Sequence, residues 1–286
     1  MTHRPNTPTD RESSFGSDEG IHRSAAPLAP TRNMLGLTLD PERVAVGLSA
    51  VVAFLTLAHV AGVFSRHVLD HDHVFGLIRL FDLDREGNIP TLFASWMCLL
   101  NGGLLATTAV LARQRGRRDW PYWMGLAVIF VFLSVDELWS IHETLTLPVR
   151  DALGVSGVFH FAWVIPYGIA VIVIGTAYLR FLVGLRRDVR WSFLTAAALY
   201  VGGAIGIEML GGQHASRVGE NNMTYGLITG AEEVFELAGL VVLTRSILAF
   251  ARAELGEVRV RFLARANAAS SLKSHAKDGP LHRDAA

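Results

Sequence analysis

Cysteine and lysine are nearly absent from this sequence. Cys98 is the only cysteine among 286 residues, which excludes an intrachain disulfide and any metal site built from several cysteines. The only lysines are Lys273 and Lys277, close to the carboxyl end of the chain. Charged residues make up 18% of the chain, whereas an average soluble domain has about 25%. Because hydrophobic residues reach 51%, the composition is typical of a membrane protein.

Several motifs of known enzyme classes are missing as well. No Walker-type phosphate loop is present, and no G-x-G-x-x-G follows a predicted strand. The zinc-protease pattern H-E-x-x-H fails because the residue three places after Glu143 is Thr146. The Glu-x-x-His pair of ferritin-like di-iron proteins fails because Trp139 stands three residues before His142. No standard catalytic motif therefore identifies the chemistry.

The sequence does contain long apolar runs. Six segments reach or approach the roughly 20 residues that a helix needs to span a bilayer. We predict that they cover residues 43–64, 91–112, 122–146, 158–185, 191–210 and 225–250. The glycine pairs Gly202/Gly206 and Gly226/Gly230 have G-x-x-x-G spacing, which predicts close helix packing in lipid. The expected fold is all-α, a polytopic membrane bundle of six transmembrane helices.

Arginines are concentrated in alternate loops, and this pattern predicts the orientation. They follow the second, fourth and sixth apolar segments at Arg113, Arg115, Arg117, Arg118, Arg186, Arg187, Arg190, Arg252, Arg259, Arg261 and Arg265. The positive-inside bias then predicts that both termini are cytoplasmic. Since membrane topology explains these arginines, we expect no nucleic-acid partner.

The expected domain organisation has three parts. Residues 1–36 are rich in Pro, Ser, Thr and Asp and are expected to form a disordered cytoplasmic tail. Residues 37–254 form the six-helix transmembrane domain, whose outer loop at 65–90 is expected to contain an interfacial helix. Residues 255–286 form a second, basic cytoplasmic tail.

Acidic residues interrupt three of the apolar segments at a similar depth, in the half of the membrane that faces outward. The third segment ends with Asp136, Glu137, His142 and Glu143, the fifth with Glu208, and the sixth begins with Glu232, Glu233 and Glu236. If the third segment is one continuous helix, Asp136, Ser140 and Glu143 share a face. We therefore predict that these acids line a single polar pocket.

Burying these carboxylates without a nearby cation costs several kcal/mol, so their charge requires an explanation. Some could be protonated, some could face water, or a divalent cation could neutralise them with His142 or His160 as nitrogen ligand. The metal interpretation also supplies the missing positive charge. Its expected ligands are Asp136, Glu137, His142, Glu208, Glu232 and Glu236, with Glu143 and Glu233 as catalytic residues and Zn, Fe or Mn as the metal.

Three functions are compatible with this pocket. The first is a metal-dependent membrane enzyme that acts on a lipid-like or other hydrophobic substrate. The second is a proton- or cation-coupled transporter or channel that uses the same acids. The third is a structural membrane protein in which the acids only form interhelical hydrogen bonds.

A second acidic stretch occupies residues 82–88 in the first outer loop. Its acids at positions 1, 3 and 5 and its glycine at position 6 resemble the opening of a calcium loop, but the twelfth position is Phe93. A complete EF-hand is therefore excluded. The stretch is either an acidic interfacial turn with a helix cap, or a lid that adds an oxygen ligand to the pocket.

Three stretches carry a family resemblance: FDLDREGNIPTLFASW, FLSVDELWSIHE and TGAEEVFELAG. They resemble a group of bacterial multi-pass inner-membrane proteins without an assigned activity. The resemblance covers roughly residues 43–250 and implies a helical membrane fold in the bacterial inner membrane, with the lipid bilayer as its partner. The ceramidase-and-receptor superfamily of membrane metal hydrolases also holds a metal among helices. Its H-x-x-x-H pair has no counterpart in the last apolar segment, which contains no histidine.

Overall fold

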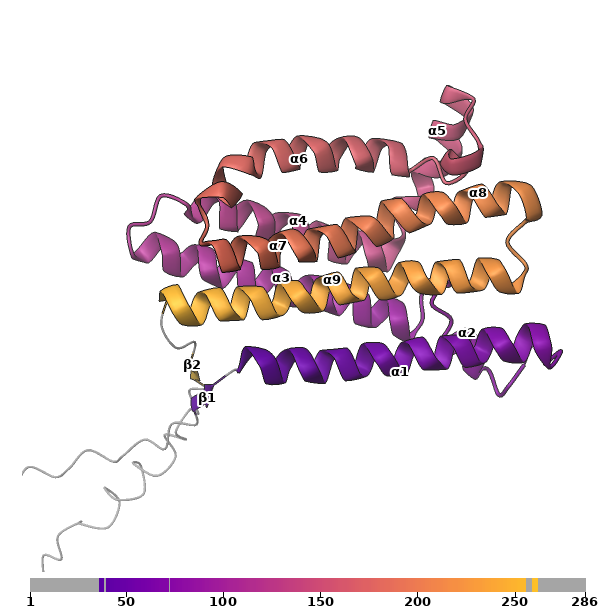
Figure 1. The fold of residues 1–286 in the computed structure, drawn as a ribbon, viewed down its shortest axis with the longest axis horizontal. Coiled ribbons are helices and arrows are strands. Elements are labelled where there is room, and N and C mark those ends of the chain that lie inside the picture. Colours follow the sequence, from indigo (N-terminus) through magenta and orange to yellow (C-terminus); the bar gives the residue numbers. More distant parts are fainter. Residues whose placement is uncertain (1–35, 39, 72, 256–258, 262–286) are drawn as a thin grey trace, which may run out of the picture. The chain divides into compact units, whose positions relative to one another are not determined.

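The computed structural model describes residues 36–38, 40–71, 73–255 and 259–261 (Figure 1). These residues lie within Gly36–Arg261, which form one unit of the chain. The two predicted tails lie outside the described residues, apart from residues 36, 255 and 259–261.

Six helices in this described part are long and apolar enough to cross a membrane. They are α1 (Pro41–Val68), α3 (Ile89–Gln114), α4 (Trp120–Trp139), α6 (Val164–Gly184), α7 (Arg187–Val201) continued by α8 (Glu208–Val218), and α9 (Met223–Leu255). Shorter elements are α2 (Leu77–Leu80), α5 (Thr146–Leu153) and the antiparallel pair β1 (Gly36–Thr38) and β2 (Arg259–Arg261). The predicted all-α multi-pass membrane fold is confirmed, with a two-stranded ribbon added to it.

Capping side chains explain where the first two long helices begin. Asp40 accepts hydrogen bonds from the backbone N–H groups of Glu42 and Arg43 at the start of α1. Asn88 accepts one from the N–H of Thr91 at the start of α3. A proline follows each cap within the first turn, where its missing N–H has no helical partner to lose.

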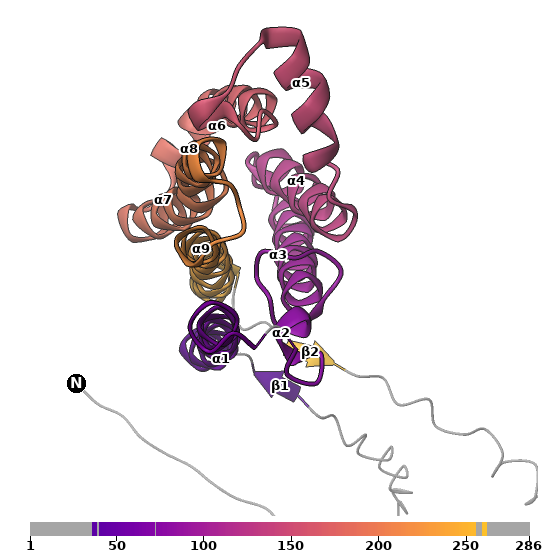
Figure 2. The ribbon, with the colours of Figure 1, turned by 90° about the vertical axis from the view of Figure 1, so that its right-hand side faces the viewer.

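The long helices form two rows with α6 lying across one side (Figure 2). One row contains α1, α9 and α7 with α8, and the other contains α3 and α4. The rows meet where α3 packs against α9. Helix α6 makes few contacts, chiefly with the helical turn between α7 and α8, and most of its apolar surface is exposed. It therefore forms a wall one helix thick.

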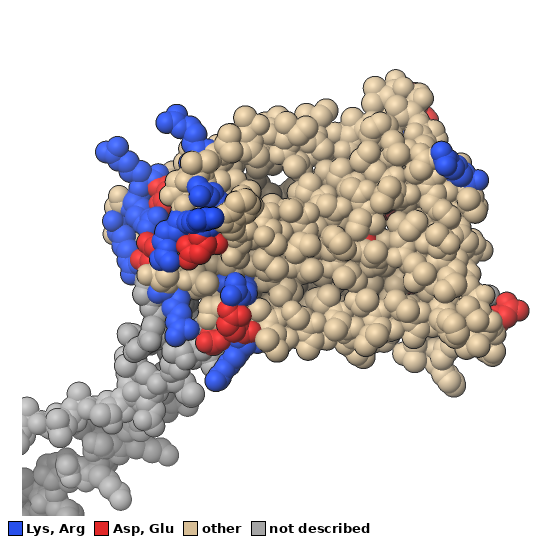
Figure 3. All heavy atoms as spheres, in the orientation of Figure 1, with Lys and Arg blue, Asp and Glu red and all other residues tan. Residues whose placement is uncertain are grey.

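The two ends of the bundle differ in charge. Arginines gather at the end formed by the α3–α4 and α6–α7 connections and the end of α9, which we call the arginine end (Figure 3). The opposite end, where α4 ends and α9 begins, is called the carboxylate end. The charge segregation agrees with the arginine pattern in the sequence, and the cytoplasmic location of the arginine end remains a prediction.

The third span ends earlier than predicted. Helix α4 stops at Trp139 because Ser140 adopts a left-handed conformation, with φ 47°. The chain then turns back, and the backbone N–H of His142 donates to a carboxylate oxygen of Asp136 at 2.8 Å. The expectation that Asp136, Ser140 and Glu143 share one helical face is therefore wrong. The following spans are also displaced, because α6 begins only at Val164 and α8 continues to Val218.

The two G-x-x-x-G pairs behave differently. Gly226 and Gly230 pack against α1, because a Cβ at either position would lie within 3.2 Å of an α1 side chain. A Cβ added at Gly202 or Gly206 would meet no neighbouring element within 4 Å. Gly203 makes the close approach to α9 instead, where its added Cβ would lie 2.8 Å from a backbone oxygen. The π-helical turn that begins at Gly202 shifts the contact face by widening the helix.

Candidate functional site

A cavity of about 1280 Å³ lies between α4, α6, α9 and the α7–α8 helix. The part of the cavity that extends toward the arginine end has apolar walls. Leu126, Leu182, Phe193 and Leu243 are among the side chains that form them. The part toward the carboxylate end is lined by acidic side chains. Figure 3 shows an opening in the surface between α6 and α7, so the thin α6 wall does not fully close the cavity.

All eight residues predicted from the sequence line this one cavity. They are Asp136, Glu137, His142, Glu143, Glu208, Glu232, Glu233 and Glu236. Asp84 and Glu86 of the outer loop join them. The acids therefore come from three long helices, the turn after α4 and the outer loop, and they face a shared space.

Asp136 is the most buried of these carboxylates, with 4% of its surface exposed. It accepts hydrogen bonds from the His142 backbone N–H at 2.8 Å and from the Tyr167 hydroxyl at 3.0 Å. A carboxylate oxygen also lies 3.4 Å from Nδ1 of the His142 ring. Asp136 thus holds the turn after α4 in place and connects it to α6.

The ring of His142 is packed as well as hydrogen-bonded. Its centroid lies 4.6 Å from that of Trp163 and 6.2 Å from that of Tyr167. The nitrogen Nε2 makes no hydrogen bond with the described residues, whereas Nδ1 faces Asp136. Burial lowers the pKa of His142, but the adjacent Asp136 carboxylate outweighs it and raises this pKa above its ordinary value.

Glu208 on α8 and Glu232 on α9 both line the cavity. Trp163 donates its indole N–H to Glu208 at 3.0 Å. Glu208 directly follows the π-helical turn Gly202–Ile207, a distortion that often occurs at functional sites.

One group of potential metal ligands occurs among the described residues. Ligand atoms of Glu86, His142 and Glu143 all lie within 4.8 Å of one another. Two of these residues belong to the predicted set, and Glu86 comes from the outer loop. The other predicted ligands line the same cavity, but no trio of His, Cys, Asp or Glu that includes them gathers to this distance in the described chain.

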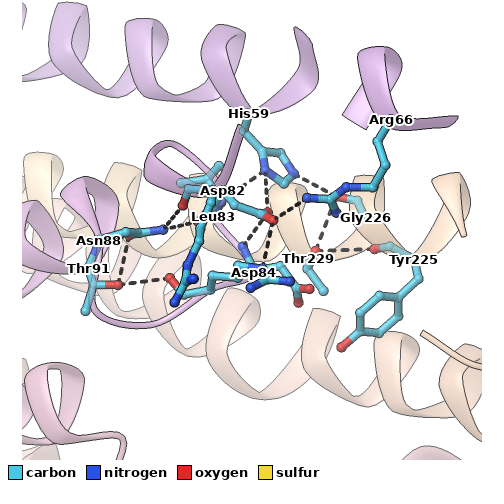
Figure 4. A network of polar contacts seen from close by, with 12 residues as sticks. His59, Arg66, Asp82, Leu83, Asp84, Asn88, Thr91, Tyr225, Gly226 and Thr229 are labelled. Carbon is cyan, nitrogen blue, oxygen red and sulfur yellow. Dashed lines mark hydrogen bonds and ion pairs between the residues drawn. The ribbon is translucent and has the colours of Figure 1, made fainter. Parts of the chain in front are cut away.

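The outer loop that carries Asp84 and Glu86 is tied down by a polar network (Figure 4). His59 of α1 connects the loop to α9: its Nε2 lies 2.8 Å from the Gly226 carbonyl oxygen, and its Nδ1 lies 3.0 Å from the Leu83 N–H nitrogen. Since the Leu83 N–H must donate, Nδ1 accepts, and Nε2 carries the proton. His59 therefore connects α1, the outer loop and α9, and its Nδ1 also lies 3.3 Å from a carboxylate oxygen of Asp82.

Asp82 anchors the same loop by charge. It pairs with Arg66 of α1 at 3.1 Å and with Arg85 at 3.5 Å, and it is buried. Asn88 closes the loop by donating to the Asp82 carbonyl oxygen at 2.6 Å while capping α3 (Figure 4). Of the two interpretations of residues 82–88, the structure contains features of both: a helix cap, and an acidic segment that lines the cavity.

The loop acids that face the cavity have raised pKa values. Burial and the neighbouring charge of Asp82 raise the pKa of Asp84 to about 7. Burial and the charge of Glu143 raise the pKa of Glu86. Both side chains retain accessible surface, but that surface faces the cavity. A cation at this end of the cavity would therefore relieve an existing repulsion.

A known protein family matches most of the helical bundle. Residues 45–250 match the family described as a domain of unknown function, DUF8692. The chain belongs to the DUF8692 family. The matched range reaches into all six long helices and includes the complete cavity lining. Searches of curated proteins and of solved structures found no significant match.

Several residues of this DUF8692 site are not identifiable as functional from the sequence. Trp163 and Tyr167 hold Glu208 and Asp136 in place, yet in the sequence they are ordinary aromatic residues at the start of a span. Their i, i+4 spacing indicates a shared helical face. That spacing carries no information about which acids they contact.

Proposed function

We propose that this protein is a membrane-embedded, metal-dependent enzyme that acts on a lipid-like or other hydrophobic substrate. The observation that carries the proposal is the meeting of Glu86, His142 and Glu143 at the acidic end of a large, otherwise apolar cavity. Imidazole and carboxylate donors together suit zinc, iron or manganese. In the proposed orientation both termini are cytoplasmic, and the site faces the outer leaflet of a bacterial inner membrane.

The surroundings of His142 support its role as a ligand. A metal-bound histidine usually donates its second ring N–H to a carboxylate, which orients the ring. Asp136 lies against Nδ1 of His142, and this leaves Nε2 available to the cation. Asp136 therefore acts in this proposal as a positioning residue rather than as a ligand.

The remaining acids supply proton transfer in the proposal. Glu137, Glu233 and Glu236 line the cavity beside the ligand group and have no ion pair with an arginine among the described residues. Glu233 is proposed as the general base that activates water for attack on the substrate. The polar part of an amphiphilic substrate would lie near these acids, and its apolar part would occupy the walls formed by α4, α6 and α7.

The lining of one cavity by Glu208, Glu232 and Glu236 favours one alternative, a proton- or cation-coupled transporter, because acids on neighbouring membrane helices are typical of proton and cation paths. The apolar lining toward the arginine end argues against it, since an ion crossing the bundle would meet side chains such as Leu182, Phe193 and Leu243. An enzyme site open at one end requires no such crossing.

Metal analysis of the purified protein tests the proposal. We expect bound zinc, iron or manganese in the wild type, and a loss of at least about tenfold in metal affinity in a Glu86→Gln, Glu143→Gln double variant. The matched control is Glu232→Gln, Glu236→Gln, which replaces the same number of carboxyl groups in the same cavity and should retain the ion. Absence of any divalent ion in the wild type, or equal loss in both variants, would overturn the assignment of these ligands.

Activity is measured separately on the metal-loaded protein. Turnover of amide or ester lipids that depends on His142 and Glu233 would support the enzyme. Metal-independent, pH-dependent ion flux in proteoliposomes that is lost in Glu208→Gln would instead support the transporter.

A further inference from the structure

A second cavity lies at the arginine end, far along the helices from the carboxylates. Its volume is about 460 Å³, and it lies between the α3–α4 connection, the end of α6 and the end of α9. Tyr122, Phe181, Leu185 and Phe250 give it apolar walls. We call it the arginine pocket.

Arginines outnumber acids in the lining of this pocket. Four arginines line it, and two of them are paired: Arg117 with Asp119 at 2.8 Å, and Arg186 with Glu254 at 3.4 Å and with Asp188, which lies outside the lining, at 2.9 Å. The side chains of the other two, Arg118 and Arg180, make no hydrogen bond or ion pair in the part of the chain that the structure describes.

The acids in the pocket are already engaged. Asp119 accepts hydrogen bonds from both Arg117 and the Trp123 indole. Glu254 is paired with Arg117 and with Arg186. No carboxylate that lines the pocket is left for Arg118 or Arg180. The lining itself contains four arginines and two acids, and the nearby Asp188 is already paired with Arg186.

Membrane topology alone does not explain this arrangement. The positive-inside bias favours arginines in loops, but Arg180 lies within the last turns of α6. All the cationic side chains here are guanidinium groups, whose planar donor pairs match phosphate oxygens. Next to the pocket, Leu179 and Val183 expose apolar side chains on the outer surface of α6, where acyl chains lie in a membrane.

We propose that the arginine pocket binds the phosphate headgroup of an anionic phospholipid between Arg118 and Arg180. The acyl chains of the lipid lie along the exposed surface of α6. Basic pockets between transmembrane helices are known to accept such headgroups. This site is independent of the proposed metal site, because the two cavities share no lining residue.

Native mass spectrometry of the detergent-solubilised full chain tests the proposal. Phosphatidylglycerol and phosphatidylcholine of the same acyl composition are the probes, and inorganic phosphate is a third. We expect phosphatidylglycerol to bind at least about tenfold more tightly than phosphatidylcholine, and phosphate alone to bind weakly. In an Arg118→Gln, Arg180→Gln variant this preference should fall to within about twofold.

The matched control is Arg43→Gln, Arg187→Gln, which removes two exposed arginines near the same membrane face that do not line the pocket. It should keep the preference. Equal binding of the two lipids by the wild type, or equal loss in both variants, would overturn the proposal. Tight binding of inorganic phosphate without a lipid preference would show a free-phosphate site and would also overturn it. Unfolding midpoints of both variants verify that they remain folded.

Discussion

Carboxylates at the two ends of this bundle have opposite environments. At the arginine end, Asp119, Asp188 and Glu254 each lie within 3.4 Å of an arginine nitrogen. At the carboxylate end, the acids on α4, α8 and α9 have no arginine partner among the described residues. Asp136 and Glu208 contact Tyr167, His142 and Trp163 instead. The presence of an acid that is paired with an arginine is explained by the stability of the ion pair. Unpaired acids that line a cavity require a proton, water or a cation.

Asp82, which anchors the outer loop, shows that arginines are present at the carboxylate end and can pair with an acid there. Asp82 lies on the same side of the bundle and is paired with Arg66 and Arg85. Those arginines pair with Asp82, and no arginine among the described residues pairs with Asp84 or Glu86. The unbalanced charge is therefore confined to the acids that face the cavity.

The largest effect in this comparison is expected at Asp136. Replacing it with Ala leaves the His142 N–H and the Tyr167 hydroxyl without their acceptor, which should cost about 3 kcal/mol of unfolding free energy. Reversible unfolding in mixed micelles measures the change. Glu220→Ala is the control, because Glu220 also lines the cavity but is exposed and should change stability by less than about 0.5 kcal/mol. Similar losses in the two variants would contradict this account.

An intermediate effect is expected at Asp84, and it should depend on pH. The pKa of this group is about 7 in the folded protein and near its ordinary value when unfolded. The folded state therefore loses stability as pH rises from about 4 to about 7. Asp84→Asn removes this loss, so the variant should become progressively more stable than the wild type over that range and keep a constant advantage above it.

Unfolding midpoints recorded from pH 4 to 8 with a chelator present measure this difference. The chelator is needed because a bound cation would neutralise the same region. A stability difference between variant and wild type that is flat across the range would show that Asp84 titrates normally in the folded state.

The smallest effect is expected at Asp119, at the paired end. Burial raises the pKa of this group, but its hydrogen bonds from Arg117 and Trp123 outweigh burial and hold the pKa below its ordinary value. Its contribution is therefore present above about pH 4 and is lost as pH falls below that value. Asp119→Asn should cost about 1 kcal/mol or less at neutral pH, and less still in 1 M salt. If the stability lost in Asp119→Asn instead increased as the pH was lowered, the proposed difference between the two ends would be contradicted.

The sequence predicts the helical part of this architecture well. Apolar run lengths identify the six spans, because a bilayer core requires a helix of about 20 apolar residues. Arginine-rich loops identify which helix ends share a side. Since neighbouring spans alternate in direction, these two features predict that the acids of three helices lie at one end, and the structure shows that they line one cavity.

Contacts between distant residues cannot be derived in this way. The end of α4 depends on one residue, Ser140, whose left-handed conformation is stabilised by hydrogen bonds to Asp136 rather than by an evident helix-breaking sequence. Likewise, Glu86 reaches His142 only because His59 and Asp82 hold the outer loop against α1 and α9.

Hydropathy and charge therefore determined from sequence alone that the chain is a membrane bundle with an acidic end, because both act through solvent and need no specific partner. Only the tertiary structure decided which of the acids come within reach of one ion. The position of these acids depends on contacts between residues that are far apart in the sequence. His59 and the Gly226 carbonyl, for example, are 167 residues apart and meet only after the helices have packed.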